Sequence, residues 1–288
     1  MSIVEKAVDK HRRLEPQLRE QKRARQQSDD AKVMAPALPN RDADSAEVVL
    51  DLELLAREGI NPDGANSISE EFRRLKRPLL DAVFRDEESV EQASDGPRRN
   101  LLLISSALSG EGKTFTALNL ALSIAHERDR TVVLIDADVA KPHVSRLLGI
   151  EERPGLLDLL KDDTLDVSEV LLQTDIDSLK VIPAGQRDEF ATELLASKRM
   201  ISIARELADR YPDRIILFDS PPLLQTAEAQ VLAGVMGQVL VVVHAGQTPQ
   251  AAVSAATELL GETPAQLVLN KSRSSTRTDY NGYYGSYY

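Results

Sequence analysis

The amino-acid sequence predicts an α/β protein with a mostly parallel sheet and helices on both faces. Short apolar runs recur along the chain, and helical segments of ordinary length separate them. Continuous apolar runs that alternate with helices are typical of a parallel sheet covered on both sides. Ligands of such sheets bind beyond the carboxyl ends of the strands, so polar residues at those ends are candidate site residues. The expected strands span residues 101–105, 131–136, 179–183, 214–219, 238–244 and 266–270.

Length and composition limit the class of protein. The 288 residues suffice for one large α/β domain with extensions, and the absence of cysteine excludes disulfides and indicates a reducing compartment. A net charge of −11 argues against a nucleic-acid partner. The chain starts with charges where a signal peptide needs an apolar run, and its most apolar stretch, 239–243, is too short to span a bilayer. We expect a cytoplasmic protein that reaches the membrane only peripherally, through a partner.

The first 65 residues are expected to form an N-terminal helical and linker region. The pattern predicts a helix over 2–26 with a weak apolar stripe and a basic face, a linker over 28–46 and a short helix over 48–57. The basic face suits an anionic membrane surface or a partner, and it suits equally a solvated helix that binds nothing.

A larger domain is expected over residues 66–277. Its first helix is predicted to begin at Ser69, an N-cap followed by acidic residues, and Pro78 is expected to interrupt or kink it. The charged, Ser/Gly/Pro-containing stretch 86–98 then marks the boundary before the first strand.

A phosphate-binding loop follows the first strand. The sequence Ser-Gly-Glu-Gly-Lys-Thr at 109–114 stands between that strand and a helix expected to begin near Lys113. Its glycines let backbone N–H groups surround phosphates, Lys113 can reach the β- and γ-phosphates, and the Thr114 hydroxyl suits Mg²⁺. The first glycine of the usual pattern is replaced by Ala107. This loop predicts the P-loop NTPase fold. The candidate nucleotide contacts in it are Ser109, Gly110, Glu111, Gly112, Lys113, Thr114 and Phe115.

Two further strands end in carboxylates. Asp136 and Asp138 close the strand over 131–136, and Asp219 closes the strand over 214–219. An acid at the end of an apolar strand beside a P-loop suits metal coordination, and a spare carboxylate can accept a proton from an attacking hydroxyl. Helix capping would explain an isolated Asp-x-Asp, but the order of these acids after Lys113 favours a catalytic role.

Five of the six tyrosines lie in the last nine residues. The surrounding residues are Gly, Ser and Asn, which lack the apolar mass to repay ordering, so residues 278–288 are expected to form a flexible tail. Tyrosines placed there are accessible for modification, or they form an aromatic surface for a partner. The candidate phosphate acceptors are Tyr280, Tyr283, Tyr284, Tyr287 and Tyr288.

Together these features resemble the bacterial tyrosine autokinases (BY-kinases) of exopolysaccharide synthesis, and most closely their cytoplasmic, exosortase-associated branch. The resemblance covers roughly residues 66–288. It rests on Walker A at 109–114, Walker A′ at 133–138, Walker B at 215–222 and the tyrosine tail. Supporting stretches are 154–160, 183–185 and 193–197.

The resemblance implies an ATP-dependent kinase that phosphorylates its own tail. Lys113 and Thr114 would hold Mg·ATP, Asp138 and Asp219 would bind the metal together with Thr114, and Asp136 would be the base. The division of roles between Asp136 and Asp138 stays open. Asn270 resembles the residue that contacts adenine in related ATPases. Where the family often has an Arg after Walker A′, this chain has Ala140.

The resemblance also implies assembly and partners. The family forms rings through a Glu-x-x-Arg-x-x-Arg helix, and two registers fit this chain. Phosphorylation would then occur between protomers. A transmembrane chain-length-determinant (polysaccharide co-polymerase) protein would activate the kinase, and a cognate tyrosine phosphatase would reverse it. The candidate interface residues are Glu71, Arg74 and Arg77 in one register and Glu70, Arg73 and Lys76 in the other.

Two other functions compete with the kinase. A partition-type or cell-division ATPase of the same fold would carry an additional lysine early in the loop, where this chain has Leu108. Such an ATPase would also leave the tyrosine tail unexplained. A scaffold with a structural nucleotide would keep its ATP, whereas a kinase converts it and labels the tail.

Overall fold

The computed structural model describes residues 48–61, 67–84 and 98–272, all of which belong to one compact unit that begins at Ser45. The helix predicted over 2–26, the linker over 28–46 and the five tail tyrosines lie outside the described residues. Of the boundary predicted over 86–98, residues 86–97 also lie outside them, whereas Arg98 already belongs to the first strand. In the described part of the chain, no helix has the length and apolar character needed to cross a bilayer.

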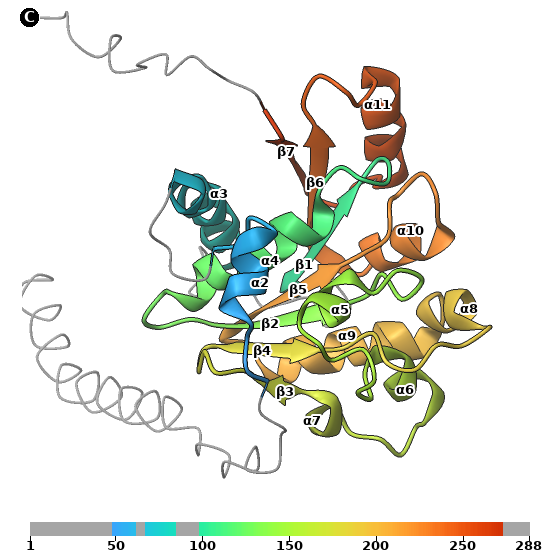
Figure 1. Cartoon of the computed structure of the whole chain (residues 1–288). Coiled ribbons are helices and arrows are strands. Elements are labelled where there is room, and N and C mark those ends of the chain that lie inside the picture. Colours follow the sequence, from blue (N-terminus) through green and yellow to red (C-terminus); the bar gives the residue numbers. More distant parts are fainter. Residues whose placement is uncertain (1–47, 62–66, 85–97, 273–288) are drawn as a thin grey trace, which may run out of the picture. The chain divides into compact units, whose positions relative to one another are not determined.

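A seven-stranded sheet forms the centre of the fold, in the order β3-β4-β2-β5-β1-β6-β7 (Figure 1). All neighbouring strands are parallel except the short β3, which runs antiparallel to β4. The six predicted strands are confirmed, and β3 was missed because two residues make no recognisable apolar run. The strands are β1 (Arg98–Ser106), β2 (Thr131–Asp136), β3 (Leu172–Gln173), β4 (Leu179–Ile182), β5 (Arg214–Asp219), β6 (Met236–His244) and β7 (Ala265–Asn270).

Helices cover both faces of this sheet (Figure 1). One face carries α2 (Leu52–Arg57), α3 (Ser67–Phe84), α4 (Lys113–Ala125) and α5 (His143–Leu147). The other carries α6 (Leu156–Lys161), α7 (Val167–Val170), α8 (Ala191–Leu195), α9 (Lys198–Arg210), α10 (Ala227–Ala233) and α11 (Gln250–Leu259). This two-sided cover is the arrangement that the apolar runs predict.

The central strands supply both halves of the core. In β1, Leu101 and Leu103 pack in the cluster under α6–α11, whereas Leu102 and Ile104 pack in the cluster under α2–α5. Successive side chains of a strand point to opposite faces, so a strand buried on both sides must be apolar at every position. The continuous runs in the sequence have this physical cause.

The N-terminal half of the described chain departs from the prediction at three points. The short helix begins at Leu52 with Asp51 as its N-cap, and Val48 pairs instead with Thr174 in a β-bridge. Ser69 lies inside α3 and is not its cap, because the helix already begins at Ser67. Pro78 does not end α3, which continues to Phe84. Pro78 is on the exposed side of that helix, where water can satisfy the carbonyl that a proline leaves without a donor.

Residues 48–61 also belong to the core of the larger domain. Leu55 and Ile60 are each 1% exposed and pack in the same cluster as α4 and β2. The packed unit therefore starts well before residue 66.

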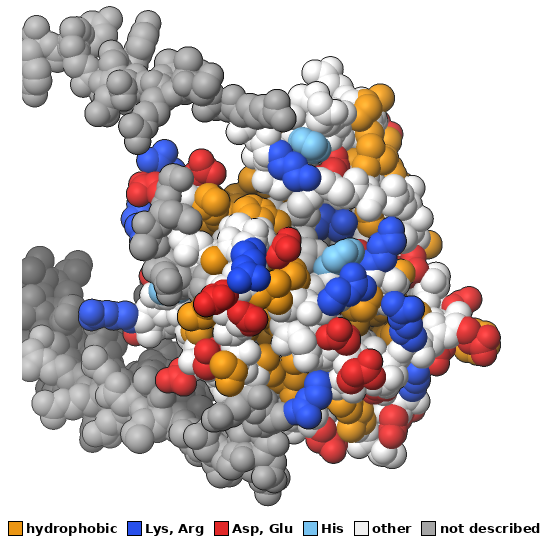
Figure 2. Space-filling model, in the orientation of Figure 1, with side chains coloured by type: hydrophobic (Ala, Val, Ile, Leu, Met, Phe, Trp, Pro, Cys, Tyr) orange, Lys and Arg blue, Asp and Glu red, His pale blue; other side chains and the backbone are white. Residues whose placement is uncertain are grey.

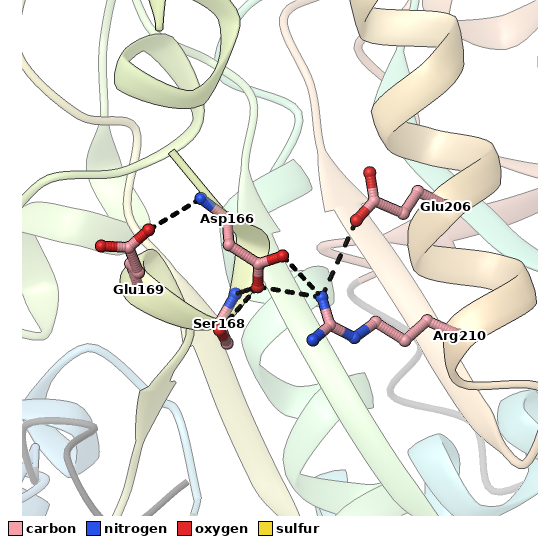
Figure 3. Close-up of polar contacts among 5 residues, drawn as sticks. All are labelled: Asp166, Ser168, Glu169, Glu206 and Arg210. Carbon is pink, nitrogen blue, oxygen red and sulfur yellow. Dashed lines mark hydrogen bonds and ion pairs between the residues drawn. The ribbon is translucent and has the colours of Figure 1, made fainter. Parts of the chain in front are cut away.

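A polar brace joins α7 to the end of α9 (Figure 3). Asp166 is the N-cap of α7, and its Oδ1 accepts from the Ser168 N–H at 2.8 Å and the Ser168 hydroxyl at 2.6 Å. The Asp166 N–H donates to Glu169, which completes a capping box. From α9, Arg210 Nη1 donates to Asp166 at 2.9 Å and lies 3.7 Å from Glu206. Every carboxylate of this brace is near the surface and paired.

Candidate active site

The P-loop has the backbone shape that phosphate binding needs. Gly110 and Gly112 have φ angles of 81° and 98°, a left-handed conformation that favours glycine. Helix α4 begins at Lys113, as predicted, and no side chain caps its N-terminus. Its first N–H groups and the positive end of its dipole therefore point toward the loop and are available to an anion.

Contacts from behind hold the loop in this shape. Glu111 is 3% exposed, and its carboxylate accepts from the Leu108 N–H at 2.8 Å and from the Thr248 hydroxyl. The Glu111 side chain is therefore bonded to protein groups on the inner side of the loop. The predicted contact between Glu111 and nucleotide stays a prediction, which its backbone can still fulfil.

The end of β7 forms a clasp on the same loop. Asn270 Nδ2 donates to the Glu111 carbonyl at 2.9 Å, and Lys271 Nζ donates to the Gly110 carbonyl at 2.8 Å. A Cβ atom on Gly112 would lie 2.0 Å from Asn270 Nδ2, so this approach also requires glycine. The adenine contact predicted for Asn270 stays a prediction. In this structure its amide bonds to the loop and to the Lys271 N–H.

Two carboxylates face each other across neighbouring strands. Strands β2 and β5 pair in parallel with Asp136 opposite Asp219. The Thr114 hydroxyl donates to Asp219 Oδ2 at 2.7 Å, which joins the start of α4 to the end of β5. Ser145 donates to Asp136 Oδ2 through its N–H at 2.8 Å and its hydroxyl at 2.7 Å. The second oxygen of each aspartate, Oδ1, is buried and has no hydrogen-bond partner among the described residues.

Burial raises the pKa of both carboxyl groups. The pKa of Asp136 rises to about 7, mainly because burial disfavours its charged form, although the bonds from Ser145 oppose the rise. The pKa of Asp219 is raised well above its ordinary value by burial and then by the charge of Asp136. A cation bound beside these two buried carboxyl groups would stabilise their charged forms.

Asp138 lies near Lys113 of the P-loop. It is 8% exposed, and burial raises its pKa while the charge of Lys113 opposes that rise. The Lys113 charge also opposes the rise in the pKa of Asp219. Sequence reasoning thus predicted four groups that the structure brings together: Lys113, Asp136, Asp138 and Asp219.

The oxygens at this point fit a magnesium ion. The unpartnered Oδ1 of Asp219, the Asp138 carboxylate and the Thr114 hydroxyl are hard donors of the kind Mg²⁺ prefers. Among the described residues, no three His or acidic side chains form a metal site by themselves. A Mg²⁺ ion in a nucleotide site commonly takes one or two carboxylates and completes its shell with phosphate oxygens and water.

The rim beside Asp138 is basic. Lys141, His143 and Arg146 are exposed on the turn and short helix that follow β2. Figure 2 shows Lys, Arg and His side chains gathered over the region labelled α5 in Figure 1. Although the chain is acidic as a whole, this part of its surface favours an anionic ligand.

Known proteins are similar to this chain in sequence and in fold. Residues 100–270 match the AAA domain family. Tyrosine-protein kinase YwqD of Bacillus subtilis is 33% identical over 202 residues, which cover 69% of this chain and 83% of YwqD. The chain belongs to the bacterial tyrosine-protein kinase family. The family expected from the sequence is thus confirmed, whereas the exosortase-associated branch stays a prediction.

Other relatives agree with this family. Putative tyrosine-protein kinase CapB of Staphylococcus aureus is 28% identical over 76% of this chain and 91% of its own length. The kinase domain of Escherichia coli tyrosine kinase ETK superposes with a TM-score of 0.62 and 26% identity, over 77% of this chain and 83% of that domain. The match to putative tyrosine-protein kinase EpsB of Ralstonia solanacearum, at 32% identity, spans only 22% of that longer protein.

The two registers of the predicted interface helix differ in this kinase. Glu71, Arg74 and Arg77 are all exposed on α3. In the other register Lys76 is 6% exposed, donates to the Ser123 carbonyl at 2.5 Å and pairs with Glu127 at 2.6 Å. Its companions Glu70 and Arg73 are exposed. The interface itself stays a prediction, and the surface display favours the first register.

Sequence reasoning missed three residues of this site. Ser145 contacts Asp136, Thr248 contacts Glu111, and Lys271 contacts the Gly110 carbonyl. Lys271 follows the chosen Asn270 directly and could have been found there. Ser145 and Thr248 belong to no recognisable motif.

Proposed function

We propose that this kinase transfers the γ-phosphoryl group of Mg·ATP to the tyrosines of its own tail, 280–288. The observation that carries the proposal is the meeting of Lys113 with three buried carboxylates, two of which keep an unpartnered oxygen. Such an arrangement offers a proton acceptor and a cation site beside a phosphate loop.

The chemistry needs little more than positioning and charge neutralisation. The tyrosine oxygen forms a bond to the γ-phosphorus, the bond between that phosphorus and the β–γ bridging oxygen breaks, and ADP leaves. Asp136 takes the phenolic proton at its Oδ1. Lys113 and the N–H groups at the start of α4 stabilise the charge that develops on the phosphate oxygens.

Mg²⁺ would be held by Thr114, Asp138 and Asp219. When bound, it neutralises phosphate charge and orients the β- and γ-oxygens. Asp219 lies at the end of β5, Thr114 in the first turn of α4, and Asp138 in the turn after β2. The assignment leaves Asp136, which Ser145 already fixes, as the proton acceptor.

The acceptor tyrosine is proposed to come from a neighbouring protomer. The exposed Glu71, Arg74 and Arg77 are the proposed contacts of α3 with that neighbour. Asn270, at the end of β7, is the proposed adenine contact once nucleotide enters.

The proposed biological role is regulation of exopolysaccharide polymerisation and export. The activator would be a transmembrane chain-length-determinant protein, which would hold the kinase at the inner face of the membrane. A tyrosine phosphatase would reset the tail. These partners come from the family resemblance, and the tail tyrosines are the feature of this chain that supports them.

Mass spectrometry of the purified chain after incubation with Mg·ATP tests the kinase, beside Lys113→Met and with the partner's cytoplasmic segment as an addition. Phosphate on Tyr280–Tyr288 in the wild type alone is the expected result. Steady ATP hydrolysis with an unlabelled tail, even with the partner segment, would identify a partition-type ATPase instead.

Mixing a variant that has no kinase activity with a variant that has no acceptor tyrosines tests transfer between protomers. Lys113→Met protein keeps its tail, and a variant with the five tail tyrosines changed to Phe keeps its active site. Phosphate on the Lys113→Met tail in the mixture is expected, whereas none there, with a normally labelled wild type, would mean transfer within one chain.

A further inference from the structure

Two stretches that support the resemblance have no part in the proposed chemistry. Residues 154–160 contain the start of α6, and residues 183–185 follow β4. Both converge on the far side of Asp136, where a short chain of hydrogen bonds connects them to its carboxylate.

Ser145 is the link that touches Asp136. It is 1% exposed, and both of its donors bond to Asp136 Oδ2. The same hydroxyl accepts from the Ala184 N–H at 3.0 Å. Since the hydroxyl has one proton, which it gives to Asp136, its orientation is fixed by the donor behind it.

Hydrogen bonds from the start of α6 hold the backbone turn that contains the Ala184 N–H. The Leu156 N–H donates to the Pro183 carbonyl at 2.8 Å, and the Leu157 N–H to the Ala184 carbonyl at 3.0 Å. Asp158 Oδ2 accepts from the Gly155 N–H at 2.8 Å and the Gln186 N–H at 3.1 Å.

Close approach at this junction excludes larger residues. A Cβ on Gly155 would lie 2.1 Å from the Pro183 carbonyl oxygen. Gly185 has a φ of 86°, and a Cβ there would meet Asp158 Oδ2 at 2.5 Å. The Pro-Ala-Gly turn and the start of α6 thus form one rigid junction.

We infer that Ser145 is a positioning residue, which fixes the Asp136 carboxylate in the orientation for proton transfer, and that Asp158 acts on Asp136 through Ser145. The inference rests on the proposed function. Two donors on Oδ2 restrain rotation of the carboxylate, so Oδ1 faces the reaction. A helix of five residues such as α5 cannot hold that geometry alone, and the junction behind it supplies the support.

Ser145 variants test this by separating the rate of transfer from nucleotide binding. Ser145→Ala removes one donor and the acceptor for Ala184, so the rate of tail phosphorylation at saturating Mg·ATP should fall about 10- to 100-fold. Among the described residues, the Ser145 hydroxyl bonds to Asp136 and Ala184 and not to the P-loop, so nucleotide affinity should change less than about twofold. Ser145→Cys fills the same space with a poor donor and should behave like the alanine variant, whereas Ser145→Thr should restore most of the rate.

A double-mutant cycle tests the path from Asp158. Asp158→Asn keeps one acceptor oxygen and should lower the transfer rate by a smaller factor. In the Ser145→Ala background it should have little further effect, since the path is already broken. Thr174→Val is the matched control, because Thr174 is another buried residue whose hydroxyl donates to backbone carbonyls, far from the carboxylates. It should leave the transfer rate unchanged.

Each outcome bears on the inference. Wild-type rates in folded Ser145→Ala and Ser145→Cys would overturn it, as would an equal loss of rate in Thr174→Val or full additivity of Asp158→Asn. A loss of nucleotide affinity as large as the loss of rate would also overturn it, by making Ser145 part of the binding site. No phosphotyrosine in the wild type would instead overturn the proposed function, and this role for Ser145 with it.

Discussion

The aspartates of the brace and those of the strand ends have opposite surroundings. Asp166 lies near the surface, and the pKa of its carboxyl is lowered, first by the Ser168 hydroxyl and also by Arg210. Asp136 and Asp219 are 0% exposed, each has an oxygen without a partner, and burial raises the pKa of both. The same side chain thus stabilises one region and is poorly accommodated in the other.

This difference separates carboxylates that stabilise the fold from carboxylates that are candidates for catalysis. A buried polar atom without a hydrogen bond is unfavourable, and native proteins keep few of them. Here two such atoms lie beside a phosphate loop, where Mg·ATP and a tyrosine hydroxyl would satisfy them. Under the proposed function, these two oxygens are the groups that would receive the cation and the phenolic proton.

The largest expected contrast is in activity. Asp136→Asn removes the proton acceptor and should lower the rate of tail phosphorylation about 10²- to 10⁴-fold. Asp166→Asn, a charge-matched control in the brace, should leave that rate unchanged. Rates from phosphotyrosine appearance would show this, and equal rates in the two variants would remove Asp136 from the mechanism.

The dependence of stability on pH should have opposite signs in the two regions. Because the pKa of Asp136 in the folded state is about 7, the folded protein binds more protons than the unfolded chain between its ordinary value and about 7. The titration of Asp136 should therefore lower the free energy of unfolding without nucleotide as pH rises through this window, by at most about 4 kcal/mol, and the raised pKa of Asp219 acts in the same direction. The lowered pKa of Asp166 acts in the other direction and only at acid pH.

Urea unfolding of the apo protein at pH values between about 4 and 8 measures this slope. Asp136→Asn should make the slope shallower, because the amide does not titrate and only the other buried carboxyl groups still contribute, while Asp166→Asn should leave it in place. A wild-type stability that rises steadily across this range would contradict the burial argument.

Substitution of the P-loop glycines should lower nucleotide affinity more than substitution of a glycine elsewhere in the fold. Gly112→Ala combines a positive φ with a clash against Asn270, so nucleotide affinity should fall about tenfold or more. Gly110→Ala has the same kind of φ but open space, so its loss should be smaller. Gly234→Ala, with a negative φ and ordinary contacts, should bind nucleotide normally. Titration calorimetry would rank the three, and equal affinities for Gly110→Ala and Gly112→Ala would deny the Asn270 clasp a role.

The smallest expected effect is in the brace itself. Asp166→Ala removes the N-cap of α7 and should lower the free energy of unfolding by about 1 kcal/mol. Tail phosphorylation should stay at the wild-type rate, because the brace is on helices away from the carboxyl ends of β1, β2 and β5. Thermal unfolding and the kinase assay measured together would show whether stability and activity separate in this way.

The sequence was sufficient for those parts that depend on local pattern. The central strands carry continuous apolar runs because both of their faces are buried, and α4 begins where the glycines of the loop end. The candidate carboxylates were found because they end buried strands. Each of these signals lies within a few neighbouring residues.

The remainder depends on contacts that no short stretch encodes. Asn270 bonds to the Glu111 carbonyl across 159 positions, and the Ala184 N–H bonds to Ser145 across 39. Strand β3 is defined only by its pairing with β4. The buried state of Lys76 depends on α4, so the sequence could not choose between the two registers of the α3 helix.

Proton release on binding is the most direct test of the proposal that the buried carboxyl groups take part in binding Mg·ATP. Titration calorimetry with a non-hydrolysable Mg·ATP analogue at about pH 6.5, in buffers of different ionisation enthalpy, counts the protons transferred. The account predicts net release of protons in the wild type, because buried carboxyl groups lose them as the cation arrives, and a smaller release in Asp136→Asn. Binding with no proton release in the wild type would show that the strand-end carboxylates are already ionised in the apo protein, and would contradict the account.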